Sequence, residues 1–84
     1  VWNEPDNRPN CWTGTDDDYF GLYAATARAL KARFPKLKVG GPGAGNSGAL
    51  AKDGLALPPF VRAFLAKCKA DGLPLDFFSW HCYT

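Results

Sequence analysis

Hydrophobic residues recur every three or four positions through the second quarter of the chain, a spacing that predicts an amphipathic helix. The apolar positions are Phe20, Tyr23, Ala24, Ala27, Leu30 and Phe34. Thr15 and Asp18 have the spacing of a capping box, and further acidic residues lie beside them at the positive end of the helix dipole. We therefore expect a helix that begins after Thr15 and ends before Pro35.

A second helix is predicted near the C-terminal end of the chain. Pro58 and Pro59 suit the first turn of a helix, because the backbone N–H that proline lacks has no partner there. The apolar face of this helix consists of Phe60, Val61, Phe64, Leu65 and Cys68. Gly72 is expected to end the helix, and Pro74 prevents it from starting again.

Three short segments read as strands. Val1 and Trp2 resemble the end of a strand that Pro5 stops, and residues 37–42 predict a brief strand that enters a glycine-rich loop. Residues 75–83 form an aromatic-rich strand, whereas residues 43–57 are turn-like or irregular. Because side chains alternate along a strand, one face should carry Phe77, Ser79, His81 and Tyr83, and the other Phe78, Trp80 and Cys82.

The order strand, helix, strand, helix, strand implies an α/β fold with a parallel sheet and right-handed crossovers. A doubly wound Rossmann sheet is disfavoured, since no GxGxxG motif joins a strand to a helix. A (β/α)₈ TIM barrel is favoured, because polar residues gather at the carboxyl ends of the first and third strands. Such a barrel needs about 250 residues, so residues 1–84 are expected to be an internal fragment of a single barrel domain.

Composition narrows the classes of partner. The 84 residues are 46% hydrophobic with a net charge of +2, which is typical of a globular protein and gives no basis for nucleic-acid binding. No apolar run approaches the roughly 18 residues that a membrane-spanning helix requires. The chain does not begin with Met, and nothing in it indicates a cellular location or an oligomeric state.

The cysteines Cys11, Cys68 and Cys82 follow no metal-finger spacing. Cys68 lies on the apolar face of the second predicted helix, where it is most simply a small buried hydrophobic residue. Cys11 and Cys82 could lie near each other at one end of the fold, so the sequence neither establishes nor excludes a disulfide between them.

Candidate chemistry centres on Glu4, a carboxylate at the end of the first predicted strand. The alternative is a surface carboxylate that caps a turn. His81 and Tyr83 lie at the corresponding end of the last strand, although His81 could equally be a hydrogen-bonded core residue. A metal site formed by His81 with Cys82 and Cys11 is disfavoured, because adjacent strand residues point to opposite faces.

Several motifs together resemble a known family. The segment Trp2-Asn3-Glu4-Pro5 resembles the Asn-Glu-Pro signature at the end of the fourth barrel strand in clan A glycoside hydrolases. Four parts of the chain are similar to family 39, which includes β-xylosidases and α-L-iduronidases: Trp12, residues 19–23, Lys38-Val39-Gly40-Gly41-Pro42 and Asp76-Phe77-Phe78-Ser79-Trp80-His81-Cys82-Tyr83. Gly43 departs from the family pattern, in which alanine is expected.

The resemblance implies that the chain spans about the fourth to sixth barrel strands with their two intervening helices. Glu4 would be the general acid/base, and the amide of Asn3 would bind the sugar 2-hydroxyl. His81 and Tyr83 would line the pocket around the reacting sugar, and Trp12 would either stack on a sugar ring or serve as a packing residue. The nucleophilic glutamate of the family would lie on the seventh strand, beyond Thr84.

The leading hypothesis is therefore part of a retaining glycoside hydrolase that cleaves β-xylosides or related carbohydrates without a metal or organic cofactor. One alternative is a non-catalytic carbohydrate-binding TIM-barrel protein that has kept the pocket. Another is a fragment of a Rossmann-type dehydrogenase, which would bind a nicotinamide cofactor. A glutamate at the end of the seventh strand would favour the enzyme over the binding protein.

Overall fold

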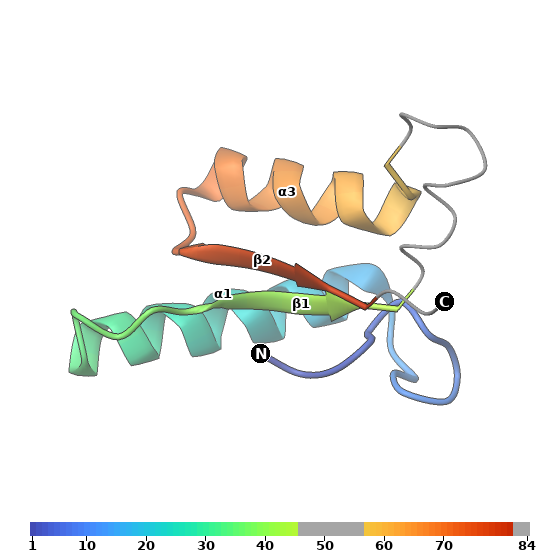
Figure 1. Cartoon of the computed structure of the whole chain (residues 1–84), viewed down its shortest axis with the longest axis horizontal. Helices are drawn as coiled ribbons and strands as arrows, with labels where there is room; N and C mark the ends of the chain where they lie inside the picture. Colours follow the sequence, from blue (N-terminus) through green and yellow to red (C-terminus); the bar gives the residue numbers. More distant parts are fainter. Residues whose placement is uncertain (46–56, 82–84) are drawn as a thin grey trace.

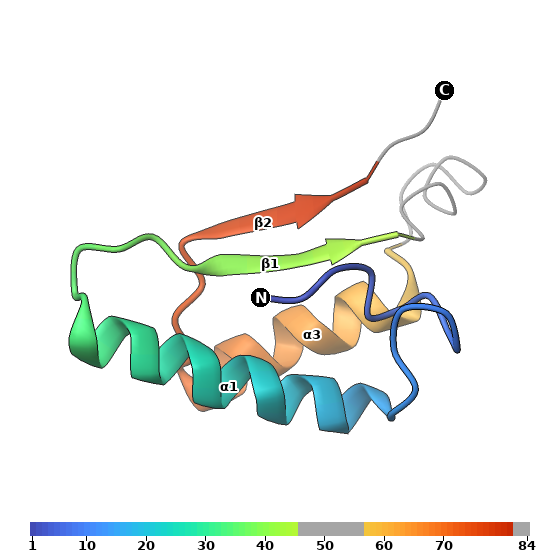
Figure 2. The same cartoon turned by 90° about the horizontal axis from the view of Figure 1, so that it is seen from below.

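A computed structural model describes residues 1–45 and 57–81. In chain order these residues form α1 (Asp16–Arg33), β1 (Gly40–Ala44), α3 (Pro59–Asp71) and β2 (Phe77–Trp80). Figures 1 and 2 show both helices on the same face of a two-stranded sheet. None of the helices in this part of the chain has the length and apolar character to cross a membrane. The result is a small α/β arrangement of two helices and two parallel strands.

Both helices have the ends that local sequence predicts. At the start of α1 the Thr15 hydroxyl accepts a hydrogen bond from the Asp18 N–H (3.1 Å), and the Asp18 carboxylate accepts one from the Thr15 N–H (2.9 Å). At the end of α3 Gly72 adopts the left-handed conformation with a φ of 61°, and its N–H donates to the last carbonyls of the helix. The predicted helices and their caps are confirmed.

The two strands pair in parallel, as predicted, but their bounds differ from the expected ones. β1 begins at Gly40 and continues to Ala44, so it is displaced towards the glycine-rich loop, and β2 is shorter than the predicted 75–83. Gly40 pairs with Phe77 and Pro42 with Ser79, whereas Ala44 pairs with Trp80. Two residues of β1 after Pro42 therefore match one residue of β2, which is a β-bulge at Gly43.

The prediction that Val1 and Trp2 end a regular strand is wrong for this structure. The N-terminal segment does run beside β1, because the Val1 amino group donates to the Gly40 carbonyl (3.0 Å) and the Glu4 N–H to the Gly43 carbonyl (3.0 Å). However, Trp2 and Glu4 have φ values of 71° and 47°. Positive φ turns the chain out of the extended conformation, so the segment forms hydrogen bonds to β1 without the geometry of a strand.

An aromatic core fills the space between the helices and the sheet. Tyr19 and Tyr23 of α1 are fully buried, and Phe64 of α3 packs edge-on against Tyr23 with ring centroids 4.9 Å apart. The Tyr23 hydroxyl donates to the Pro74 carbonyl (2.6 Å), and burial raises the pKa of Tyr23 to about 12. The predicted burial of Cys68 on the apolar face of α3 is confirmed. Hydrophobic contact between α1 and α3 is thus dominated by rings.

The residues that precede the two strands are joined by the side chain and backbone of Asp76. The Asp76 carboxylate accepts a hydrogen bond from the Val39 N–H (2.8 Å) and lies 2.6 Å from the Lys31 Nζ. The Asp76 N–H in turn donates to the Val39 carbonyl (2.7 Å). The bond from Lys31, together with that from Val39, holds the pKa of Asp76 below its ordinary value of 3.8.

Replacing Thr15 with alanine should lower the free energy of unfolding by about 1 kcal/mol, because the Asp18 N–H at the start of α1 loses its acceptor. Chemical denaturation of the purified protein measures the change. Thr13→Ala, in the same loop and exposed, is the matched control and should have little effect. Equal losses in the two variants would contradict the role of the cap.

Replacing Asp76 with asparagine should remove part of the acid sensitivity of the fold. Because the folded-state pKa of Asp76 is depressed, its contribution is present above the unfolded pKa of about 3.9 and is lost as the pH falls through the lower folded value. Wild type and Asp76→Asn should therefore differ most in unfolding free energy above about pH 5 and converge as the pH falls through the lowered folded-state pKa. Denaturation at several pH values measures this, with Asp17→Asn as the control. A difference independent of pH would refute it.

Candidate active site

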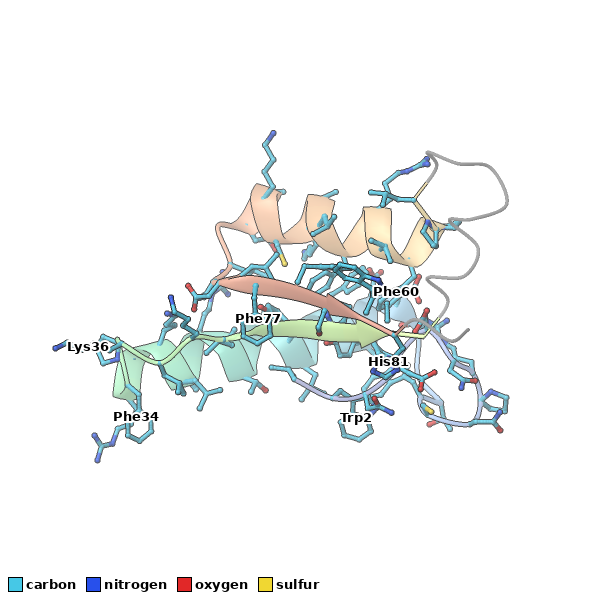
Figure 3. All side chains as sticks on the ribbon, in the orientation of Figure 1. Trp2, Phe34, Lys36, Phe60, Phe77 and His81 are labelled. Carbon is cyan, nitrogen blue, oxygen red and sulfur yellow. The ribbon has the colours of Figure 1, made fainter. Side chains whose placement is uncertain are left out.

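Three segments meet at the carboxyl end of the sheet: residues 1–4, the end of β1 and the end of β2. The Glu4 N–H donates to the Gly43 carbonyl, and the His81 N–H donates to the Ala44 carbonyl (2.8 Å). Figure 3 shows His81 at the end of β2, on the side of the molecule where the N-terminal segment lies. These backbone bonds bring Glu4 and His81 together from opposite ends of the chain.

The bulge at Gly43 connects the segments. Gly43 has a φ of 67°, which favours glycine, and the bulge removes its peptide groups from the regular ladder. Its N–H donates instead to the Ser79 hydroxyl (3.0 Å), while its carbonyl accepts from Glu4. Gly43 therefore links the backbone of Glu4 to β1 and, through Ser79, to β2.

The Glu4 carboxyl group has different surroundings at its two oxygens. Oε2 lies 3.2 Å from His81 Nδ1, a contact that becomes an ion pair when the imidazole is protonated. Oε1 faces Gly45, where an added Cβ would lie 2.8 Å from the Glu4 Cδ. The Glu4 side chain is only 17% exposed. A partly buried carboxyl group is thus held between a histidine and a glycine.

The Asn3 side chain also lies near Gly43, at the carboxyl end of the sheet. An added Cβ on Gly43 would lie 3.7 Å from His81 Nε2 and 3.9 Å from Asn3 Oδ1, so both side chains converge on this glycine. Asn3 itself is exposed. The structure therefore brings together three of the predicted site residues, Asn3, Glu4 and His81.

The remaining predicted site residues lie elsewhere or are not described. Trp12 packs edge-on against Trp2 and Tyr19, with ring centroids 5.3 and 5.8 Å away, and its Nε1 donates to the Thr15 carbonyl (2.9 Å). These contacts place Trp12 in the loop before α1. Tyr83 lies outside the described residues, as does Cys82, and with it the proposed pairing with Cys11. Within residues 1–45 and 57–81, no group of three His, Cys, Asp or Glu side chains could hold a metal ion.

A polar cavity next to Glu4 was not anticipated from the sequence. It has a volume of about 300 Å³ and is lined by Glu4, Asp6, Asn7, Arg8 and Gly45. The Gly45 N–H donates to the Asp6 carboxylate (2.9 Å), so the loop after Glu4 is attached to the end of β1. The only signal in the sequence is the run of polar residues directly after Pro5, and by itself this run predicts no more than a loop.

Comparison with known proteins shows which family the chain is similar to. The model of the family "Glycosyl hydrolases family 39" matches residues 1–84. The chain is 41% identical over 83 residues to a beta-xylosidase from Caldicellulosiruptor saccharolyticus and 42% identical over 86 residues to one from Geobacillus stearothermophilus. These alignments cover 99% and 100% of the chain.

A solved structure, that of a glucosidase from Croceicoccus marinus, is similar with a TM-score of 0.78 and 40% identity over 93% of the chain. The chain spans about 15% of the length of this protein and of both beta-xylosidases. Because the family model matches every residue and the relatives exceed 40% identity, the chain belongs to glycosyl hydrolase family 39.

Proposed function

We propose that this chain supplies the general acid/base, Glu4, of a retaining glycoside hydrolase that acts on β-xylosides. The observation that carries the proposal is the contact between the Glu4 carboxyl group and His81 at the carboxyl end of a parallel sheet. Carboxylates with the chemistry of Glu4 occur at this end of barrel strands in enzymes of the TIM-barrel class. The two beta-xylosidase relatives support the choice of sugar.

The arrangement also fits an arc of a (β/α)₈ barrel that comprises about strands four to six. Both helices cover one face of the sheet, as the outer helices of a barrel do (Figure 2). On the other face Phe77 is 49% exposed, whereas Phe78 packs against the helices. Strands contributed by the rest of the protein would cover Phe77 in a closed barrel.

Retaining hydrolysis requires two carboxyl groups about 5–5.5 Å apart. One attacks the anomeric carbon, while the other protonates the departing glycosidic oxygen. We assign Glu4 to the second role and propose that the nucleophile is a glutamate on the seventh strand, beyond Thr84. In the second step Glu4 would remove a proton from the water that releases the sugar from the nucleophile. Two carboxyl groups suffice for this chemistry, so no metal or organic cofactor is proposed.

The neighbouring side chains would position the acid and the sugar. His81 Nδ1, 3.2 Å from Glu4 Oε2, restricts the orientation of the carboxyl group. Asn3 is proposed to bind the sugar 2-hydroxyl, and the approach of both Asn3 and His81 to Gly43 supports this proposal. Tyr83 as a pocket residue and Trp12 as a sugar-stacking residue stay predictions.

Replacing Glu4 with alanine in the full-length protein should lower kcat/KM for methyl β-xyloside about 10²–10⁴-fold. Methoxide is a poor leaving group that needs a proton, whereas 4-nitrophenolate leaves without one, so hydrolysis of 4-nitrophenyl β-xyloside should fall much less. Azide should restore turnover of the 4-nitrophenyl substrate by attacking the glycosyl-enzyme.

Asp71→Ala removes a surface carboxylate of α3 and serves as the control for the Glu4 variant. Equal rates for wild type and Glu4→Ala on both substrates would refute the role assigned to Glu4, and so would equal losses on both. A protein that binds xylosides but hydrolyses neither would support the carbohydrate-binding alternative.

Replacing His81 with phenylalanine keeps an aromatic ring but removes the nitrogen next to Glu4 Oε2. If His81 positions the acid, kcat/KM for methyl β-xyloside should fall about tenfold, because the Glu4 carboxyl group loses the polar contact that orients it. The 4-nitrophenyl substrate should be affected less. Steady-state kinetics on both substrates measures this, and an identical loss on the two would show that His81 does not act through the acid.

A further inference from the structure

The hydroxyl group of Tyr19 connects the helical layer to the segment that carries Glu4. It donates a hydrogen bond to the Val1 carbonyl (2.7 Å), so α1 is bonded to a residue three positions before Glu4. An added Cβ on Gly41 would lie 3.7 Å from the Tyr19 hydroxyl and 3.5 Å from the Val1 nitrogen. The hydroxyl, the Val1 backbone and β1 therefore meet at one place, between the helix and the sheet (Figure 2).

The Tyr19 ring has little freedom to move. Tyr19 is fully buried, and interiors of proteins are closely packed. Aromatic rings surround it from both helices and from the preceding loop, with ring centroids 5.8 to 6.5 Å away: Trp12, Phe20, Tyr23, Phe60 and Phe64. Because the core fixes the ring, the hydroxyl is a fixed donor rather than a group at the end of a mobile side chain.

The segment that this hydroxyl holds has an unfavourable backbone conformation. Trp2 and Glu4 have φ values of 71° and 47°, in the left-handed region that residues with a side chain seldom adopt. Such conformations persist only where the surrounding contacts hold them. The bond from Tyr19 to Val1 holds one end of the segment, and the bond from the Glu4 N–H to the Gly43 carbonyl (3.0 Å) holds the other.

We infer that Tyr19 is a positioning residue, whose hydrogen bond to Val1 sets the direction from which the Glu4 carboxyl group reaches the glycosidic oxygen. The inference rests on the proposed role of Glu4 as the general acid. Tyr19 is buried in the core, so it acts through the backbone of the segment and leaves proton transfer to Glu4. A displaced acid is a poorer acid, because the donor must lie within hydrogen-bond reach of the oxygen that receives the proton.

Tyr19→Phe in the full-length protein tests the inference, because it removes the hydroxyl and keeps the ring. Hydrolysis of methyl β-xyloside, whose leaving group needs a proton, should lose about tenfold in kcat/KM, as expected for a displaced acid. Hydrolysis of 4-nitrophenyl β-xyloside, whose leaving group needs none, should change less than about twofold. If 4-nitrophenyl β-glucoside is hydrolysed faster than the xyloside, the corresponding glucosides are used.

Tyr23→Phe is the matched control. Tyr23 lies one turn further along α1, is also fully buried, and donates its hydroxyl to the Pro74 carbonyl (2.6 Å), which precedes β2 at the other end of the sheet from Glu4. Both variants lose one buried hydrogen bond, so both should lower the midpoint of chemical denaturation. Only Tyr19→Phe should change the ratio of the rates on the two substrates, whereas a merely structural role for Tyr19 would give both variants the same kinetics.

A second pair of replacements tests the donor without changing the volume of the side chain. 4-Aminophenylalanine in place of Tyr19 keeps a hydrogen-bond donor at the end of the ring, whereas 4-methylphenylalanine puts a group of similar size there that cannot donate. The first should retain the wild-type ratio of rates on the two substrates. The second should show the selective loss on methyl β-xyloside, even if Tyr19→Phe fails to fold.

The inference is overturned if the variants without a donor at position 19 slow the two substrates equally, or if their kinetics match those of Tyr23→Phe. That result is distinct from failure of the proposed function. If Glu4 is not the acid, Glu4→Ala itself shows no selective loss on methyl β-xyloside. If Glu4 is the acid and only the role of Tyr19 is wrong, Glu4→Ala shows the selective loss and Tyr19→Phe does not.

Discussion

The hydrogen bond from the Glu4 N–H to the Gly43 carbonyl is the constraint on which the candidate site depends. It is available because the bulge turns the Gly43 carbonyl out of the ladder between β1 and β2. The same bulge lets Ser79 accept from the Gly43 N–H, so the N-terminal segment and both strands are joined at one residue.

The aromatic core is also bonded to the N-terminal segment that carries Glu4. Tyr19 is fully buried between the helices and donates its hydroxyl to the Val1 carbonyl (2.7 Å), so the segment that carries Glu4 is attached to α1 as well as to β1. Burial raises the pKa of Tyr19 above its ordinary value of 10.0. Core packing and site geometry are thus coupled through one side chain.

Family membership gives the geometry its chemical meaning. A partly buried carboxyl group that lies next to a histidine and lines a polar cavity fits the role of general acid proposed for Glu4. Beta-xylosidases and a glucosidase are all similar to the chain at about 40% identity.

The sequence by itself determined the two helices, because the capping box at Thr15, the glycine at position 72 and the hydrophobic periodicity all act over a few residues. It also placed Glu4 and His81 at corresponding ends of parallel segments. Only the tertiary structure decided the bounds of the strands, the turn of the backbone at Trp2 and Glu4, and the cavity beside Glu4. These features depend on hydrogen bonds between residues far apart in the chain, such as Gly45 with Asp6 and His81 with Ala44, which no local pattern encodes.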